Sequence, residues 1–151
     1  MIIIGIDPDS NKSGYSEYLN GTLTDLRSLS LIDIYEMFSF IDSIGENPEL
    51  HIEDVNGISS NAFSYNKKDS IPVKLKKAEH VGKCKQAQIE IERIAEHFNI
   101  KVVRHAVSKQ WKDQPGKKEF ERVTGWTGRS NKDTRSAAYF GILGVMAHAK
   151  K

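Results

Sequence analysis

The chain has 151 residues, a net charge of +2 and a mean hydropathy of −0.49, values typical of a soluble globular protein of one domain, residues 1–151. No apolar run approaches the length of a membrane span, so we expect no transmembrane helix. No basic segment precedes the first strand-like residues, so we expect no signal peptide. The single cysteine, Cys84, excludes an intramolecular disulfide and a cysteine zinc site, and it fits a reducing compartment such as the cytoplasm.

The charges are distributed unevenly along the chain. Residues 1–62 contain two Lys or Arg and eleven Asp or Glu, whereas residues 101–151 contain twelve Lys or Arg and four Asp or Glu. Such a chain suits a protein that binds a cation through its acidic part and a polyanion through its basic part. A dipolar, solvated surface without a partner explains the same distribution.

The first strand ends in an acidic residue. Residues 1–6 are apolar and rich in isoleucine, which predicts a fully buried strand in the middle of a sheet. Asp7 follows, and Pro8 to Gly14 form a turn. A carboxylate at the rim of a buried strand is costly unless it is paired or binds a cation. Asp7 is therefore a candidate metal ligand, and capping of the turn is its alternative role.

Two further strands and a helix come next. Residues 14–19 are predicted to pair with the first strand, and Asn20-Gly21 is a strong signal for a hairpin turn into a third strand over 22–29. Apolar residues at helical spacing predict a helix over 31–41.

A second strand with acidic residues at its end is predicted over residues 50–55, beside the first. Glu53 and Asp54 point to opposite faces of this strand because the side-chain period is two. Only one of them can therefore face the same side as Asp7.

Residues 56–77 lack periodicity and are predicted to form a long loop. Aromatic side chains beside lysines suit nucleic acid, since rings stack on bases and ammonium groups bind phosphates. Burial of the aromatic rings in the core, with the lysines solvated, is an equally good interpretation. The candidate contacts in this loop are Phe63, Tyr65, Lys67 and Lys68.

The second half of the chain is predicted to contain three helices and a strand. A helix over 79–98 and a fifth strand over 100–104 lead into a basic segment with a short helix over 117–123. The last helix spans 131–148, with Asp133 in its first turn, where an anion stabilises the helix dipole.

The order of these elements resembles the ribonuclease H-like nuclease fold, an α/β fold with a five-stranded mixed sheet flanked by helices. Within it, the sequence resembles the RuvC-type Holliday-junction resolvases, particularly small phage-like members. Three segments carry the resemblance: Gly5-Ile6-Asp7-Pro8-Asp9-Ser10 with Gly14-Tyr15, Ile52-Glu53, and Lys132-Asp133-Thr134-Arg135-Ser136-Ala137-Ala138.

Two residues depart from the family pattern. Asp9 stands where the family usually has glycine, a change that is tolerable if the turn allows a positive φ for aspartate. Ser136 occupies the position of the last acid and is a weaker ligand than a carboxylate, although it remains a candidate fourth-ligand position. Either the other three acids suffice, or the chain binds junctions without cutting well.

The resemblance implies a metal-dependent endonuclease that cuts branched DNA at four-way junctions as a homodimer. Asp7, Glu53 and Asp133 would be the catalytic and metal-binding residues, with Mg²⁺ or Mn²⁺ as the ion. Phosphate contacts are expected from Lys109, Lys112, Lys117 and Lys118. The alternatives are a monomeric nuclease of the same fold that acts on RNA–DNA hybrids, and a junction-binding protein with a weakened site.

Overall fold

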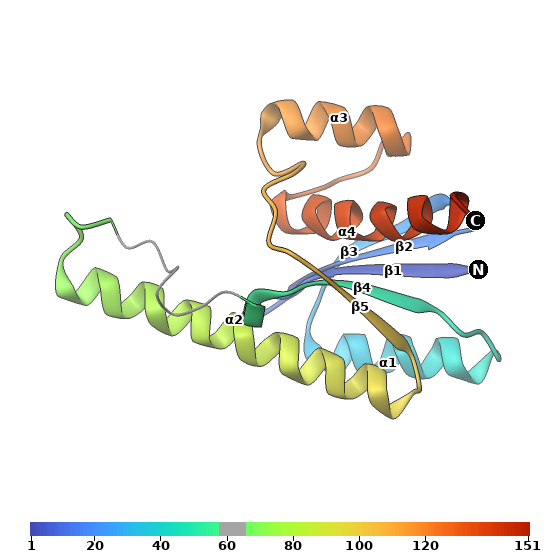
Figure 1. Cartoon of the computed structure of the whole chain (residues 1–151), viewed down its shortest axis with the longest axis horizontal. Helices are drawn as coiled ribbons and strands as arrows, with labels where there is room; N and C mark the ends of the chain where they lie inside the picture. Colours follow the sequence, from blue (N-terminus) through green and yellow to red (C-terminus); the bar gives the residue numbers. More distant parts are fainter. Residues whose placement is uncertain (58–65) are drawn as a thin grey trace.

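A computed structural model describes residues 1–57 and 66–151 as one mixed sheet with helices on both faces (Figure 1). The strands are β1 (Ile2–Asp7), β2 (Ser13–Leu19), β3 (Thr22–Leu29), β4 (Glu49–Glu53) and β5 (Lys101–His105). The helices are α1 (Leu31–Ser43), α2 (Ile71–His97), α3 (Gln114–Thr124) and α4 (Lys132–Ala149), and η1 (Val55–Gly57) is a 3₁₀ turn.

The strand order is β3-β2-β1-β4-β5. β1, β2 and β3 form an antiparallel meander, whereas β4 and β5 run parallel to β1. The predicted five-stranded mixed sheet flanked by helices is therefore confirmed. The hairpin between β2 and β3 is also confirmed, because Asn20 and Gly21 have φ values of 50° and 85°, as a type I′ turn requires.

Alternating side chains of β1 serve two separate cores. The even-numbered isoleucines of β1 pack with α1 and α2 on one face, together with Phe38 and Ile91. Ile3 points to the other face and packs with Trp111 and Phe120 near α4. The period of two therefore sends odd-numbered residues of β1 toward α4, and Asp7 is the last of them.

Helix α4 approaches the sheet more closely than ordinary side chains allow. A Cβ at Gly5 would lie 2.0 Å from the carbonyl oxygen of Ala137, and one at Gly14 would lie 2.1 Å from that of Asp133. The Ser16 hydroxyl donates a hydrogen bond of 3.0 Å to the Ala137 carbonyl. Glycine at two positions thus lets the backbones of the helix and the sheet meet.

Helix α2 begins eight residues earlier than the sequence pattern predicts. The predicted loop over 56–77 is wrong for residues 71–77, which form the first two turns of the helix. Pro72 lies in the first turn, where its missing N–H has no helical partner to lose. This first half of α2 projects beyond the sheet (Figure 1) and shows no apolar stripe, with Ile71 73% and Leu75 65% exposed.

The remaining boundaries differ from the predicted ones by a few residues. The fourth strand ends at Glu53 rather than continuing to Val55, which opens η1 instead. The short helix over 117–123 extends from Gln114 to Thr124. No helix within residues 1–57 and 66–151 is both long and apolar enough to cross a membrane.

Candidate active site

Asp7 and Glu53 lie side by side at the ends of two parallel strands. Ile6 pairs with Ile52 in the register of β1 and β4, so the next residue of each strand is acidic. Both side chains face α4 and both residues are buried, Asp7 with 5% and Glu53 with 4% of its surface exposed. Two buried carboxylates are thus brought together by strand register alone.

Asp54 faces the opposite side of the sheet, as the strand period requires. Its Oδ1 accepts a hydrogen bond of 3.0 Å from Gln88 Nε2 of α2 and another of 3.0 Å from the backbone N–H of Gly57. Glu53, and not Asp54, is therefore the neighbour of Asp7.

Asp133 reaches the site from the first turn of α4. Asn131 caps this helix, since its side chain accepts from Thr134 N while the Thr134 hydroxyl accepts from Asn131 N. The close approach at Gly14 then holds the first turn against β2. We call Asp7, Glu53 and Asp133 the carboxylate cluster.

The members of the carboxylate cluster perturb one another. Burial, the hydrogen bond to Asp7 and the negative charge of Asp7 raise the pKa of Glu53 to about 8. Burial, followed by the charges of Asp7 and Asp9, raises the pKa of Asp133. A cation in the cluster would relieve this repulsion.

A lysine supplies positive charge at this place. Lys112 Nζ lies 3.2 Å from Asp7 Oδ2. Burial lowers the pKa of Lys112, but the charges of Asp7 and Glu53 outweigh burial and raise it overall. Lys112 was predicted as a phosphate ligand, and the structure places its ammonium group against the carboxylate cluster.

The loop that holds Lys112 is fixed by Arg135 of α4. The buried guanidinium donates from Nε to the Trp111 carbonyl at 2.8 Å and from Nη2 to the Lys112 carbonyl at 2.9 Å. Trp111 has a φ of 67°, a left-handed conformation that costs energy for a bulky residue. No sequence pattern indicated this role of Arg135, because it depends on a loop 23 residues away in the chain.

The donor set fits a hard divalent cation, although the three carboxylates do not form one compact group. Among the described residues, Asp7 Oδ2 and Ser136 Oγ are buried without a hydrogen-bond partner. Lys112 contacts Asp7 Oδ2 as an ion pair without hydrogen-bond geometry. Unsatisfied carboxylate and hydroxyl oxygens are the ligands that Mg²⁺ and Mn²⁺ prefer.

The other predicted site residues have different environments. Lys109 and Lys118 are exposed, and Lys117 lies 3.7 Å from Glu121 on α3. Lys67 and Lys68 are exposed in the turn before α2. Phe63 and Tyr65 lie outside the described residues. Ser136 follows Asp133 by one turn of α4 and is 1% exposed, and its predicted role as a ligand stays a prediction.

The turn does not ask for a positive φ at Asp9, which has none, so aspartate fits where the family has glycine. Its Oδ1 accepts a hydrogen bond of 2.6 Å from Ser10 N, and its own N–H donates one of 3.0 Å across the turn to Ser13 Oγ.

Solved structures with the same architecture identify the fold. A Thermus thermophilus RuvC structure in complex with a Holliday junction substrate aligns with a TM-score of 0.66, over 99% of this chain and 96% of that chain, at 12% sequence identity. This chain has the RuvC-type fold. A second Thermus thermophilus RuvC structure aligns with a TM-score of 0.62 and 13% identity, again over 99% and 96% of the two chains. No protein-family model and no curated protein sequence matches the chain.

Proposed function

We propose that this protein is a metal-dependent, structure-specific endonuclease that hydrolyses phosphodiesters in branched DNA. The observation that carries the proposal is the pair of buried carboxylates, Asp7 and Glu53, at adjoining strand ends of a RuvC-type fold. The RuvC structure that aligns with this chain was solved with a Holliday junction substrate, which supports a four-way junction as the DNA.

Asp7, Glu53 and Asp133 are the residues that would hold Mg²⁺ or Mn²⁺. Such ions activate water and stabilise the leaving oxygen in phosphodiester hydrolysis. The chain contributes the orientation of the ligands: strand register aligns Asp7 with Glu53, and the capped first turn of α4 presents Asp133. Ser136 would add a hydroxyl as a fourth ligand.

Lys112 would bind the scissile phosphate beside the carboxylate cluster. Its ammonium group lies 3.2 Å from Asp7 Oδ2, so a phosphate held beside the carboxylate cluster would be within its reach. Arg135 would keep the Lys112 backbone in place. The more distant phosphates and bases would be bound by Lys67, Lys68, Lys109, Lys117, Lys118, Phe63 and Tyr65.

Two symmetric cuts in a junction need two active sites, so we propose a homodimer of this one domain. A labelled four-way junction, incubated with the protein with and without Mg²⁺, tests the proposal. Paired symmetric nicks that require Mg²⁺ are expected. Degradation of the RNA-containing strand of a hybrid, with an intact junction, would instead indicate a hybrid nuclease of the same fold.

Asp7→Asn is expected to abolish cleavage while leaving junction affinity unchanged. The substitution removes a metal ligand without creating a cavity, and it relieves repulsion with Glu53, so the free energy of unfolding should stay equal or rise slightly. Asp54→Asn is the matched control, because it neutralises the adjacent acid on the opposite face. Wild-type cleavage by folded Asp7→Asn protein would overturn the assignment.

One observation favours a second candidate function. The hydroxyl of Ser136 replaces a carboxylate, and this weaker ligand suits a protein that binds junctions without cutting them. Tight junction affinity without a Mg²⁺-dependent product would support that function over hydrolysis.

A further inference from the structure

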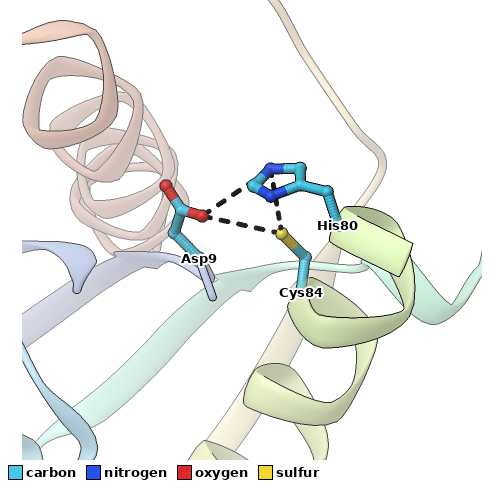
Figure 2. Close-up of side chains that lie close together, drawn as sticks. All are labelled: Asp9, His80 and Cys84. Atoms are coloured by element: carbon cyan, nitrogen blue, oxygen red, sulfur yellow. Dashed lines mark hydrogen bonds and ion pairs between the residues drawn. The ribbon is translucent and has the colours of Figure 1, made fainter. Parts of the chain in front are cut away.

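Three different metal-binding side chains meet outside the carboxylate cluster: Asp9, His80 and Cys84 (Figure 2). Cys84 Sγ lies 3.6 Å from His80 Nε2 and 3.7 Å from Asp9 Oδ1. His80 Nε2 lies 3.8 Å from the same Asp9 oxygen. Of the acidic, histidine and cysteine side chains in the described ranges, these are the three whose ligand atoms all lie within 4.8 Å of one another.

The secondary structure explains why these residues meet. His80 and Cys84 are four residues apart on α2, so their side chains lie on the same face of the helix. Asp9 comes from the turn after β1, 75 residues before Cys84. The Cys84 residue is buried, whereas the side chains of His80 and Asp9 are 59% and 30% exposed, so an ion can enter from solvent.

The three separations match those around a tetrahedral ion. With Zn–S bonds of about 2.3 Å and Zn–N and Zn–O bonds of about 2.1 Å, tetrahedral angles place S and N, and S and O, about 3.6 Å apart. The same angles place N and O about 3.4 Å apart. The separations of 3.6, 3.7 and 3.8 Å differ from these values by about 0.4 Å or less. An ion therefore fits with only small side-chain movements.

We propose that Asp9, His80 and Cys84 bind a transition-metal ion with the preferences of Zn²⁺, at a site that shares no residue with the carboxylate cluster. The two sites adjoin, because the Asp9 carboxylate interacts with Asp133. Sulfur and imidazole ligands favour Zn²⁺ and similar ions and are poor ligands for Mg²⁺. Three protein ligands leave the fourth position to water. The alternative use of these groups is a weak S–H···O hydrogen bond from Cys84 to Asp9 beside an exposed histidine.

The ion would fasten α2 to the turn after β1. Cys84 is the first buried residue of α2, and the residues from Ile71 to Lys83 that precede it are exposed or half-buried. The site therefore lies where the supported half of the helix gives way to the projecting half. Binding to the folded chain alone would raise the free energy of unfolding through mass action.

Titration of the reduced, metal-free chain with Co²⁺ tests this site independently of nuclease activity. One equivalent of Co²⁺ is expected to produce a thiolate-to-cobalt charge-transfer band and the visible bands of a tetrahedral ion. Excess Zn²⁺ should remove these bands and excess Mg²⁺ should not, because Mg²⁺ competes only for oxygen ligands. The carboxylate cluster has no sulfur and cannot produce the thiolate band.

Two variants and a matched control make the result specific. His80→Ala, at an exposed position, should weaken Co²⁺ binding at least about tenfold. Cys84→Ala should abolish the thiolate band, and Zn²⁺ should no longer raise its Tm. His97→Ala removes another exposed histidine of α2 and should bind Co²⁺ like the wild type.

Binding of Co²⁺ without a thiolate band would overturn the proposal, since the ion would then occupy carboxylates elsewhere. An unchanged Kd for folded His80→Ala would also overturn it. Both results would leave the proposed nuclease function untouched, because that function depends on the carboxylate cluster.

Discussion

A buried arginine, Arg135, supports the candidate active site, and among residues 1–57 and 66–151 it has no acidic partner. The Arg135 guanidinium bonds two carbonyl oxygens and the Ser130 hydroxyl, the last at 3.1 Å. A buried charge is tolerated only when its donors are satisfied, and here the acceptors belong to the loop that holds Lys112. The same contacts hold Trp111 in its left-handed conformation.

Arg135→Met should destabilise the fold and loosen Lys112. The two carbonyl oxygens would be left without donors in a buried place, which costs about 2–4 kcal/mol of unfolding free energy. Urea unfolding measures this loss. Arg129→Met is the control, because Arg129 is exposed in the connection between α3 and α4. Equal stabilities of the two variants would contradict the role given to Arg135.

Ser136→Asp should restore a fourth acid to the site. Its carboxylate would be buried beside the carboxylate cluster, so the variant should melt lower than the wild type in chelator. Metal binding offsets the repulsion, so this deficit should shrink or reverse in millimolar Mg²⁺, and cleavage should need less Mg²⁺.

Ser136→Asn is the control for Ser136→Asp, since it adds similar volume without charge. A melting deficit that does not respond to Mg²⁺, together with an unchanged metal requirement for cleavage, would leave Asp133 as the only ligand from α4.

The candidate site residues at strand ends could be predicted from the sequence, whereas the roles of site residues that depend on loops could not. Asp7 and Glu53 follow apolar strands, and a carboxylate there stands out against the pattern. The roles of Lys112 and Arg135 arise from a loop packed against a helix, which leaves no periodic signal. The single cysteine led us to exclude a cysteine zinc site, and the site proposed at Asp9, His80 and Cys84 would need only that one cysteine.

Strand β4 carries a hydrogen-bonded chain of polar residues on the face that holds Glu53. Glu49 Oε1 accepts from His51 Nε2 at 2.7 Å, which leaves Nδ1 of a neutral His51 as an acceptor. His105 Nε2, 2.7 Å from that atom, must then be the donor. Burial lowers the pKa of His51 and of His105. Burial thus favours the neutral form of His51 on β4 and of His105 on β5.

Glu49→Gln should change the stability of the fold in acid. Burial alone would raise the pKa of Glu49, but hydrogen bonds from Lys101, His51 and His148 outweigh it and lower the pKa to about 2. A folded-state pKa below the unfolded value stabilises the fold above pH 4.5, and this contribution disappears as the pH falls to about 2. It amounts to at most about 3 kcal/mol.

The variant should therefore be less stable at pH 7 and lose less stability between pH 4.5 and pH 2 than the wild type. Urea unfolding across this range measures the difference, with Glu46→Gln as the control at an exposed position in the same segment. Parallel pH profiles for wild type and Glu49→Gln would show that the hydrogen bonds to Glu49 add no stability.

Helix α2 shows why hydrophobic periodicity can predict only part of a helix. Its second half buries Cys84, Ala87 and Ile91 against the rest of the fold, and the apolar spacing there predicted the helix. Its first half projects beyond the sheet and buries no stripe, so no such spacing is needed. Apolar residues recur at helical spacing where a helix packs against a core, so a helical segment without a packing partner need not show that spacing.

The overall topology follows from the order of elements in the sequence. The order of strands and helices read from the sequence resembles that of the ribonuclease H-like fold, and this resemblance predicted the mixed sheet and its flanking helices. The detail that escaped prediction is the course of residues 106–113, whose turns are set by tertiary contacts with α4.

The charge asymmetry of the whole molecule should affect how strongly its DNA affinity depends on salt. Each phosphate neutralised by a lysine contributes about −0.9 to the slope of log affinity against log salt on duplex arms. The double variant Lys67→Ala with Lys68→Ala should therefore flatten the slope by up to about 2, without moving the position of the cut. Junction affinity measured from low to moderate salt gives both slopes.

Lys150→Ala with Lys151→Ala is the matched control for this charge effect, since it removes the same charge at the end of the chain. Identical slopes for the wild type and the Lys67 and Lys68 variant would place this pair outside the DNA interface.

The direct backbone contact between the sheet and α4 also determines which substitutions the protein can tolerate there. Because Gly5 and Gly14 leave no side chain between them and the carbonyls of Ala137 and Asp133, the spacing between β1 and the helix has no adjustable filler. The helix backbone is therefore already in contact with the sheet and cannot approach it more closely. Even a methyl group at Gly5 would displace α4 from β1. The two glycines therefore determine the distance between the helix and the sheet at the candidate site.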